Sequence, residues 1–213
     1  MSTQLDARRT PRDPEKTRER ILDAAQALIL DHGYGATTVD AVVGRAGITK
    51  GAFFHHFASK AELARTLIQR FAAWDRKYLE DHVAHAEKLA SDPLQQLLTL
   101  IALYEEDFTK LEEPFPGCLF AAYIYENKLF DDGVLEILRE STLFWRATMR
   151  RKLDQVVALH PPRKPVDLDA VADLFYALTE GSFIMAKTLG DNGLLARHAR
   201  ELRTLLEVLF EPR

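Results

Sequence analysis

The apolar residues of this chain recur mostly three or four positions apart, which is the spacing of amphipathic helices. The first such stripe predicts a helix that begins at Pro14, is capped by Asp13 and ends at Gly33. Proline and glycine residues separate the later stripes and predict where each helix stops. The pattern predicts an all-α fold of about nine helices, over residues 14–33, 39–46, 50–56, 59–88, 93–108, 117–128, 131–159, 166–189 and 193–210.

The stretch Thr38–Phe57 predicts two short helices joined by a tight turn. Apolar residues share one face of the first helix, and Gly47 follows at the position where a left-handed residue would end it. Thr49 is placed to cap the second helix, over residues 50–56. This is the layout of a helix-turn-helix, in which the second helix enters the major groove of DNA.

Five short motifs in this region read Thr38-Val39, Ala46-Gly47-Ile48-Thr49-Lys50-Gly51, Phe53-Phe54, His56-Phe57 and Ser59-Lys60-Ala61-Glu62-Leu63. Together they resemble the DNA-binding signature of TetR-family transcriptional regulators, and the similarity extends from Pro14 to about Phe71. The resemblance implies a homeodomain-like three-helix domain over residues 14–58 and a helical ligand-binding and dimerisation domain over residues 59–213. Residues 1–13 are polar and contain two prolines, so we expect a mobile basic tail there.

Several side chains in and around the second short helix have the chemistry to contact DNA. Thr38 and Thr49 each combine a helix cap with a hydroxyl that can donate to a phosphate, and Lys50 offers a charge to the backbone or to a guanine edge. Gly51 would let the helix approach the groove closely. Phe54 stands where family members usually have a tyrosine, so one phosphate hydrogen bond is expected to be lost. The residues expected to contact DNA are Thr38, Arg45, Thr49, Lys50, Gly51, Phe54, His55, His56 and Lys60.

The net charge of −4 is unusual for a DNA-binding protein, but the charge is unevenly distributed. Residues 1–60 hold nine Lys/Arg and seven Asp/Glu, and the rest of the chain holds 19 and 25, so the net charges are +2 and −6. This asymmetry favours an N-terminal part that faces DNA. Within that part, Arg45 either reaches the DNA backbone or is only solvated, and Lys60 is expected to face a phosphate.

The composition argues against several classes of protein. The apolar runs are far shorter than the ~18–20 residues of a membrane span, and the polar N-terminus is not expected to be a secretory signal. A single cysteine fits a reducing compartment, so the expected location is cytoplasmic. The chain contains no HExxH, CxxC, Walker or G-x-S-x-G motif, so we expect neither an enzyme nor a bound cofactor or metal.

Aromatic residues recur along the predicted C-terminal helices, which is compatible with an apolar cavity for a small molecule. Ordinary core packing is the alternative explanation for many of them. Cys118 lies in a Gly-Cys-Leu-Phe start that is familiar from one branch of the family; it would either pack as a small apolar residue or sense oxidants and electrophiles. The expected effector-binding residues are Trp74, Tyr78, Phe108, Cys118, Tyr123, Trp145 and Phe175.

The last two predicted helices, over residues 166–189 and 193–210, carry more apolar surface than one small domain can cover. We expect them to form a homodimer, as in the family, and two recognition helices then suit a palindromic operator. The expected function is a DNA-binding regulator, by the resemblance a repressor, released by a small hydrophobic or aromatic effector. The alternatives are an interaction or small-molecule-binding protein of the same fold with weakened DNA binding, and an all-α enzyme.

Overall fold

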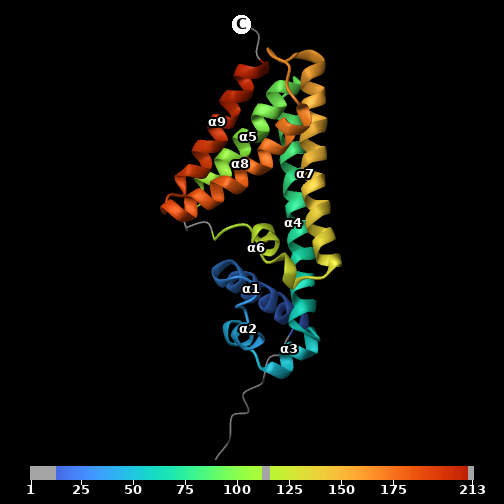
Figure 1. Ribbon diagram of the computed structural model, residues 1–213, viewed down its shortest axis with the longest axis vertical. Helices are drawn as coiled ribbons and strands as arrows, with labels where there is room; N and C mark the ends of the chain where they lie inside the picture. Colours follow the sequence, from blue (N-terminus) through green and yellow to red (C-terminus); the bar gives the residue numbers. More distant parts are fainter. Residues whose placement is uncertain (1–12, 112–115, 211–213) are drawn as a thin grey trace, which may run out of the picture. The chain divides into compact units, whose positions relative to one another are not determined.

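The computed structural model describes residues 13–111 and 116–210, and the regular elements in these two stretches are all helical (Figure 1). The all-α fold is therefore confirmed. The expected tail, apart from Asp13, lies outside the described residues, as does Pro114, one of the prolines that separate the predicted helices. The helices are α1 (Pro14–His32), α2 (Val39–Ala46), α3 (Lys50–His56), α4 (Lys60–Leu89), α5 (Pro93–Thr109), α6 (Leu119–Tyr125), the short 3-10 helix η1 (Asn127–Leu129), α7 (Asp132–Leu159), α8 (Leu168–Leu189) and α9 (Gly193–Phe210).

Capping residues set most of the helix ends. Asp13 accepts a hydrogen bond from the backbone N–H of Glu15 at 3.1 Å and starts α1 where the sequence predicts. Most boundaries lie within one residue of the expected ones, and the larger differences are in α8 and α6. Asp167 caps α8, which consequently begins at Leu168 and not at residue 166. The helix expected to reach residue 128 ends at Tyr125, and a turn of 3-10 helix follows it.

The described residues form two compact units, and the division between them falls inside α4, between Leu67 and Ile68. The N-terminal unit consists of α1, α2, α3 and the first turns of α4. Three short helices cannot bury their apolar faces alone, so the start of α4 completes their core. Its fully buried side chains include Ile21, Leu22, Val42, Phe53, Phe57, Leu63 and Leu67.

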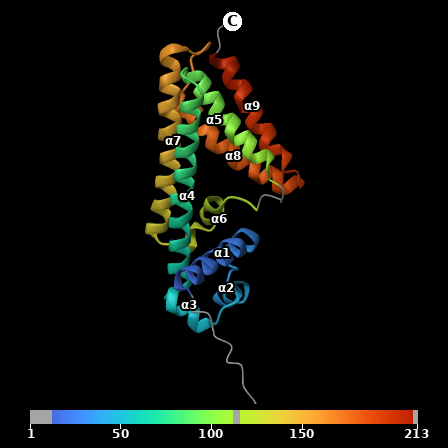
Figure 2. The same cartoon turned by 180° about the vertical axis from the view of Figure 1, so that it is seen from behind.

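The C-terminal unit is a helical bundle in which the remainder of α4 lies alongside α7, as Figures 1 and 2 both show. Two polar contacts join these long helices: Trp145 Nε1 donates to Asp75 at 2.7 Å, and Lys152 Nζ donates to Glu87 at 2.9 Å. Lys152 is only 1% exposed and also donates to Gln96, so its buried charge is compensated.

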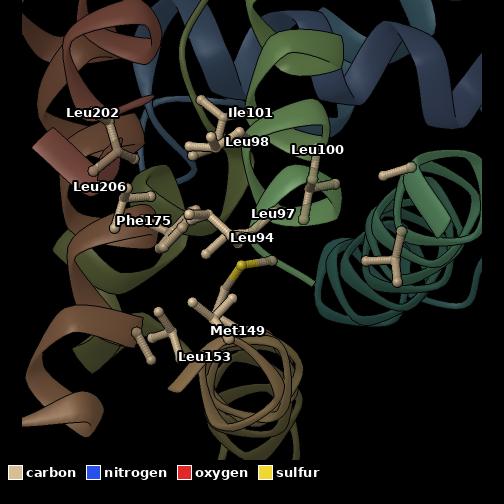
Figure 3. Packing of buried hydrophobic residues seen from close by; sticks show 14 of the residues in the cluster. Leu94, Leu97, Leu98, Leu100, Ile101, Met149, Leu153, Phe175, Leu202 and Leu206 are labelled. Carbon is tan, nitrogen blue, oxygen red and sulfur yellow. The ribbon is translucent and has the colours of Figure 1, made fainter. Parts of the chain in front are cut away.

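The core of the C-terminal unit lies where α4, α5, α7, α8 and α9 meet (Figure 3). Leucine and isoleucine side chains from one face of α5 point toward Phe175 of α8 and toward apolar residues of α7 and α9. This arrangement follows from the 3.6-residue stripe on each helix, since each stripe needs an apolar partner. The labelled members of the core are Leu94, Leu97, Leu98, Leu100, Ile101, Met149, Leu153, Phe175, Leu202 and Leu206.

Candidate DNA-binding and effector sites

The turn between α2 and α3 is held by its own backbone and by α1. Gly47 adopts the left-handed conformation (φ 61°, ψ 44°) that the sequence predicts, and the Ile48 N–H donates to the Val43 carbonyl at 3.2 Å. The Arg20 guanidinium donates to the carbonyl of Ala46, which satisfies a helix-end acceptor. Arg20 therefore positions the turn, a role that the sequence alone did not reveal.

α3 has one buried and one exposed side. Phe53 and Phe57 are buried in the N-terminal unit, with ring centroids 6.0 Å apart, and they fix the orientation of the helix. Phe54 is 49% exposed on the other side, where Lys50 and Gly51 are exposed as well. A Cβ atom built on Gly51 meets no atom within 4 Å, so this side of the helix is open.

Thr38 and Thr49 cap α2 and α3 as expected. Their hydroxyl oxygens accept hydrogen bonds from the backbone N–H groups of Ala41 at 3.1 Å and Ala52 at 3.2 Å. Both threonines are exposed, so each hydroxyl hydrogen is available to a DNA phosphate while the oxygen keeps its cap. The role that the sequence suggests for them is therefore compatible with the geometry.

The two basic residues expected at this surface form only exposed ion pairs. Lys50 Nζ lies 2.9 Å from Asp40, and Arg45 lies 4.0 Å from Asp31. Exposed pairs of this kind contribute little to stability, so a phosphate can displace the carboxylate partner. Both cations are thus free to turn toward DNA.

The adjacent histidines differ in their surroundings. His55 is exposed, whereas His56 is partly buried, and their rings are 5.2 Å apart. Burial lowers the pKa of His56, and the neighbouring His55 and Arg18 lower it further. The shift favours the neutral form of His56, which could offer DNA an N–H but no positive charge.

Lys60 differs most from the sequence-based expectation. Its ammonium donates to the carbonyl of Tyr34 at 2.5 Å and lies 4.0 Å above the centroid of the Tyr34 ring. A second carbonyl, that of Gly35, lies 3.4 Å away. The side chain thus ties the start of α4 to the loop after α1, because that loop leaves carbonyls without helical partners.

These contacts predict a structural effect of the Lys60→Ala substitution. We expect it to lower the free energy of unfolding by about 1–2 kcal/mol, because a charged hydrogen bond and a cation–π contact are lost. Urea denaturation of the full chain measures the change, with Lys50→Ala as the control that should stay near the wild type. Equal stabilities for the two variants would mean that Lys60 is not a structural tie.

A small cavity of about 30 Å³ lies inside the C-terminal unit. Three of the residues expected to bind an effector line it: Phe108, Trp145 and Phe175. Tyr104 lines it too. Drug-sized ligands occupy about 300–1,000 Å³, so these side chains would have to separate before such a molecule could bind there.

Three other residues expected to bind an effector pack elsewhere. Trp74 is 55% exposed and stacks on Tyr78, with ring centroids 5.2 Å apart. The Tyr78 hydroxyl donates to Asp107 at 2.5 Å. Tyr123 is fully buried and stacks on Phe130 at 4.4 Å. None of the three lines the small cavity.

Cys118, immediately before α6, lies in an environment that disfavours its reactive form. Burial and the neighbouring Glu180 carboxylate raise the pKa of the thiol far above its usual range. The thiolate is the nucleophile in cysteine chemistry, so this site favours the packing interpretation over sensing.

A larger groove of about 270 Å³ lies on the α8 side of the same unit, with Phe120, Tyr176 and Glu180 in its wall. The sequence reasoning missed Glu180 and Asp75 as candidate site residues. A signal for Glu180 was present, since it is the only charged residue between Asp173 and Lys187. Asp75 could not be found in this way, because α4 has charged residues on either side of it.

Two further features of the described residues bear on function. Within the described ranges, no three His, Cys, Asp or Glu side chains are grouped to hold a metal ion. Among the helices listed above, none is both long and apolar enough to cross a membrane.

Comparison with known proteins relates the chain to a family. Residues 21–67 match the model described as bacterial regulatory proteins, tetR family, and residues 93–202 match the tetracyclin repressor-like C-terminal domain. The chain is 26% identical to the probable acrEF/envCD operon repressor of Escherichia coli K12 over 166 residues, which cover 78% of this chain and 73% of the relative. It is 34% identical over 89 residues to the HTH-type transcriptional regulator TtgR of Pseudomonas putida, covering 41% and 40% of the two chains.

A solved structure supports the fold independently. The crystal structure of a TetR-family transcriptional regulator from Agrobacterium tumefaciens superposes with a TM-score of 0.73 and covers 93% of this chain and all of that one. Its sequence is 24% identical, so it is evidence for the fold alone. Together with the two family models, which span both units, these similarities show that the chain belongs to the TetR family of bacterial regulatory proteins.

Proposed function

We propose that this protein is a homodimeric repressor that binds a palindromic operator through α3 of each copy and leaves it when a small molecule binds the C-terminal unit. Membership of the family makes the chain a DNA-binding transcriptional regulator and sets aside the all-α enzyme. The curated relatives support repression in particular, since those named as repressors include proteins of Escherichia coli and Mycolicibacterium smegmatis.

The exposed side of α3 is the observation that carries the proposal. Lys50 and Gly51 lie on the open side of a helix that Phe53 and Phe57 anchor from behind. A rigid helix with a side-chain-free position can approach base edges closely, and a lysine there can reach a guanine or a phosphate. Thr49 adds a phosphate donor at the helix start.

Exposed apolar side chains on α8 and α9 support dimerisation through these two helices. Ile184 of α8 is 51% exposed and Leu205 of α9 is 63% exposed. Apolar side chains gathered on neighbouring helices are typical of an interface with a second copy. The full set is Leu174, Ile184, Met185, Leu189, Leu205 and Val208.

The aromatic interior of the C-terminal unit supports a small-molecule effector. For release to occur, the effector must bind the conformation that does not fit the operator more tightly than the conformation that does, because equal affinity shifts no equilibrium. The C-terminal unit offers the small cavity and the larger groove for such a molecule. Rings pack tightly around the cavity, so a ligand whose binding moves Trp145 or its neighbours would distinguish the two states.

A mobility-shift titration with DNA from upstream of the protein's own gene tests the proposal. We expect saturable binding of one dimer to a palindromic site in the presence of competitor DNA. Absence of specific binding even at low salt would favour the alternative, a protein of the same fold with weakened DNA binding, for which Phe54 in place of tyrosine is the motivating observation.

A further inference from the structure

Two carboxylates inside the C-terminal unit have no cationic partner among the described residues. Asp75 of α4 accepts a hydrogen bond from Trp145 Nε1 at 2.7 Å. Glu180 of α8 is hydrogen-bonded to the thiol of Cys118. Buried carboxylates are normally paired with a cation, since desolvation penalises the charged form. Here the nearest polar partners are an indole and a thiol, which are neutral.

The two carboxylates belong to one connected cluster. Tyr176 precedes Glu180 by one turn of α8, so both side chains lie on the same side of the helix. The Tyr176 ring centroid is 6.3 Å from that of Trp145, and Trp145 in turn holds Asp75. Two aromatic rings, those of Trp145 and Tyr176, therefore lie between the two carboxylates.

The electrostatics of the cluster follow from this arrangement. Burial raises the pKa of Asp75 to about 6, and the Trp145 hydrogen bond opposes only part of that effect. Burial and the charge of Asp75 also raise the pKa of Glu180. Two like charges in a poorly solvated region each disfavour the ionisation of the other, and a bound cation would reverse the effect for both.

A hydroxyl beside this cluster has no hydrogen-bond partner. The Tyr104 hydroxyl oxygen is buried. Within the described part of the chain, it is the buried side-chain polar atom that lacks a hydrogen-bond partner. The ring lies 5.9 Å from that of Trp145 and lines the small cavity. Unpaired buried hydroxyls are costly, but this one belongs to the small cavity and not to the groove that contains Glu180, so it does not identify the occupant of that groove.

The groove of about 270 Å³ gives access to Glu180. Its walls include the aromatic rings of Phe120, Tyr125 and Tyr176. Arg139 also lines the groove, and its guanidinium pairs with Glu136 at 3.1 Å and not with Glu180. Aromatic faces together with a carboxylate are the groups that recognise organic cations in proteins.

We propose that the effector is an organic cation with a bulky apolar or aromatic body, which occupies this groove and places its charge beside Glu180, with Asp75 as the second carboxylate. The inference rests on the proposed function, because it names the effector of that regulator. A cation of this kind supplies the counter-charge that Glu180 lacks, while the rings bind its apolar body. Asp75 does not line the groove and would act on the cation only through its charge at longer range. An anion of the same shape is repelled by the same two groups.

Two ions of nearly the same shape and opposite charge test the inference: tetraphenylphosphonium and tetraphenylborate. Isothermal titration calorimetry on the full-length protein measures both at pH 7.5. We expect the phosphonium to bind at least about tenfold more tightly than the borate, because the charge of the site selects between ligands of equal size. Failure of the phosphonium to bind, or equal or tighter binding of the borate, would overturn the inference.

Glu180→Gln provides the matched variant, because it removes the charge and keeps an acceptor for the Cys118 thiol. We expect it to weaken phosphonium binding about tenfold or more and to leave borate binding unchanged or stronger. Asp154→Asn is the control: it removes an exposed carboxylate of α7 that pairs with Arg150, and it should change neither affinity. If Glu180→Gln does not fold, Asp75→Asn makes the same test, since its amide oxygen can still accept from Trp145.

The same preparations are titrated with operator DNA, which separates this inference from the proposed function. Operator binding without a preference for the phosphonium overturns the cation site and leaves the regulator intact. A preference for the phosphonium that disappears in Glu180→Gln, in a protein that binds no operator, supports the cation site and removes the regulator. Unchanged phosphonium affinity in the folded Glu180 or Asp75 variant overturns the cation site.

Discussion

Replacing Leu205 by glutamate is expected to convert the dimer to a monomer at micromolar concentration. The side chain is 63% exposed on α9, which packs beside α8, and the proposed interface would bury it. Burying an unpaired carboxylate costs several kcal/mol, so the dimer dissociation constant should rise by about 10²-fold or more. Operator affinity should fall with it, because a monomer presents one reading helix to a two-fold site.

Sedimentation equilibrium over a range of concentrations measures the change. Leu89→Glu is the matched control, because Leu89 is similarly exposed (60%) but lies at the end of α4 and outside the proposed interface. We expect this control to remain dimeric. A dimeric Leu205→Glu, or equal dissociation of both variants, would mean that the copies meet through another surface.

Asp75→Asn is expected to stabilise the ligand-free protein at pH 7. The pKa of Asp75 is raised by burial from 3.8 to about 6, so the folded state holds this proton more tightly than the unfolded state does. Stability is then lost as the pH rises from about 4 to 6, and the loss is complete above the folded pKa. The asparagine variant avoids this loss and should be more stable by about 1–3 kcal/mol at neutral pH, with the gain disappearing below about pH 4.

Asp107→Asn is a control that should change the stability in the opposite direction. Burial raises the pKa of Asp107, but hydrogen bonds from Tyr78 and His82 outweigh it, and the pKa is lowered overall. Its ionised form therefore contributes stability that is present at neutral pH and lost as the pH falls through the folded pKa, so the amide variant should be less stable at pH 7. Chemical denaturation between pH 4 and pH 8 measures both variants. Destabilisation by Asp75→Asn at neutral pH would contradict the inference that the Asp75 carboxylate lacks a compensating cation.

The sequence predicted most of the fold because the relevant signals are local. Periodic apolar stripes and side-chain caps such as Thr49 determine where helices lie and begin, and their partners are only a few residues away. Gly47 is found in the same way, since its left-handed backbone is required by the turn itself. The end of α6 was less predictable, because no proline or glycine marks the change to 3-10 helix at Glu126.

The tertiary contacts of the candidate sites could not be predicted from spacing. Lys60 looks like a phosphate-binding lysine in the sequence, yet its ammonium lies on the ring and carbonyl of Tyr34, 26 positions away. Asp75 and Trp145, which are 70 positions apart, meet only because α4 and α7 run side by side. The recurrence of aromatic residues along the helices likewise predicts a cavity but not its volume, which depends on how closely the rings pack.

The salt dependence of operator affinity in the wild type and in Lys50→Ala tests the role of α3 most directly. Each phosphate contact made by a lysine releases counterions, so its loss lowers the slope of log affinity against log salt by about 1. We expect Lys50→Ala to bind the operator more weakly at low salt, with a shallower slope and with unchanged stability. An affinity and a slope equal to those of the wild type would contradict the proposal that α3 reads the DNA.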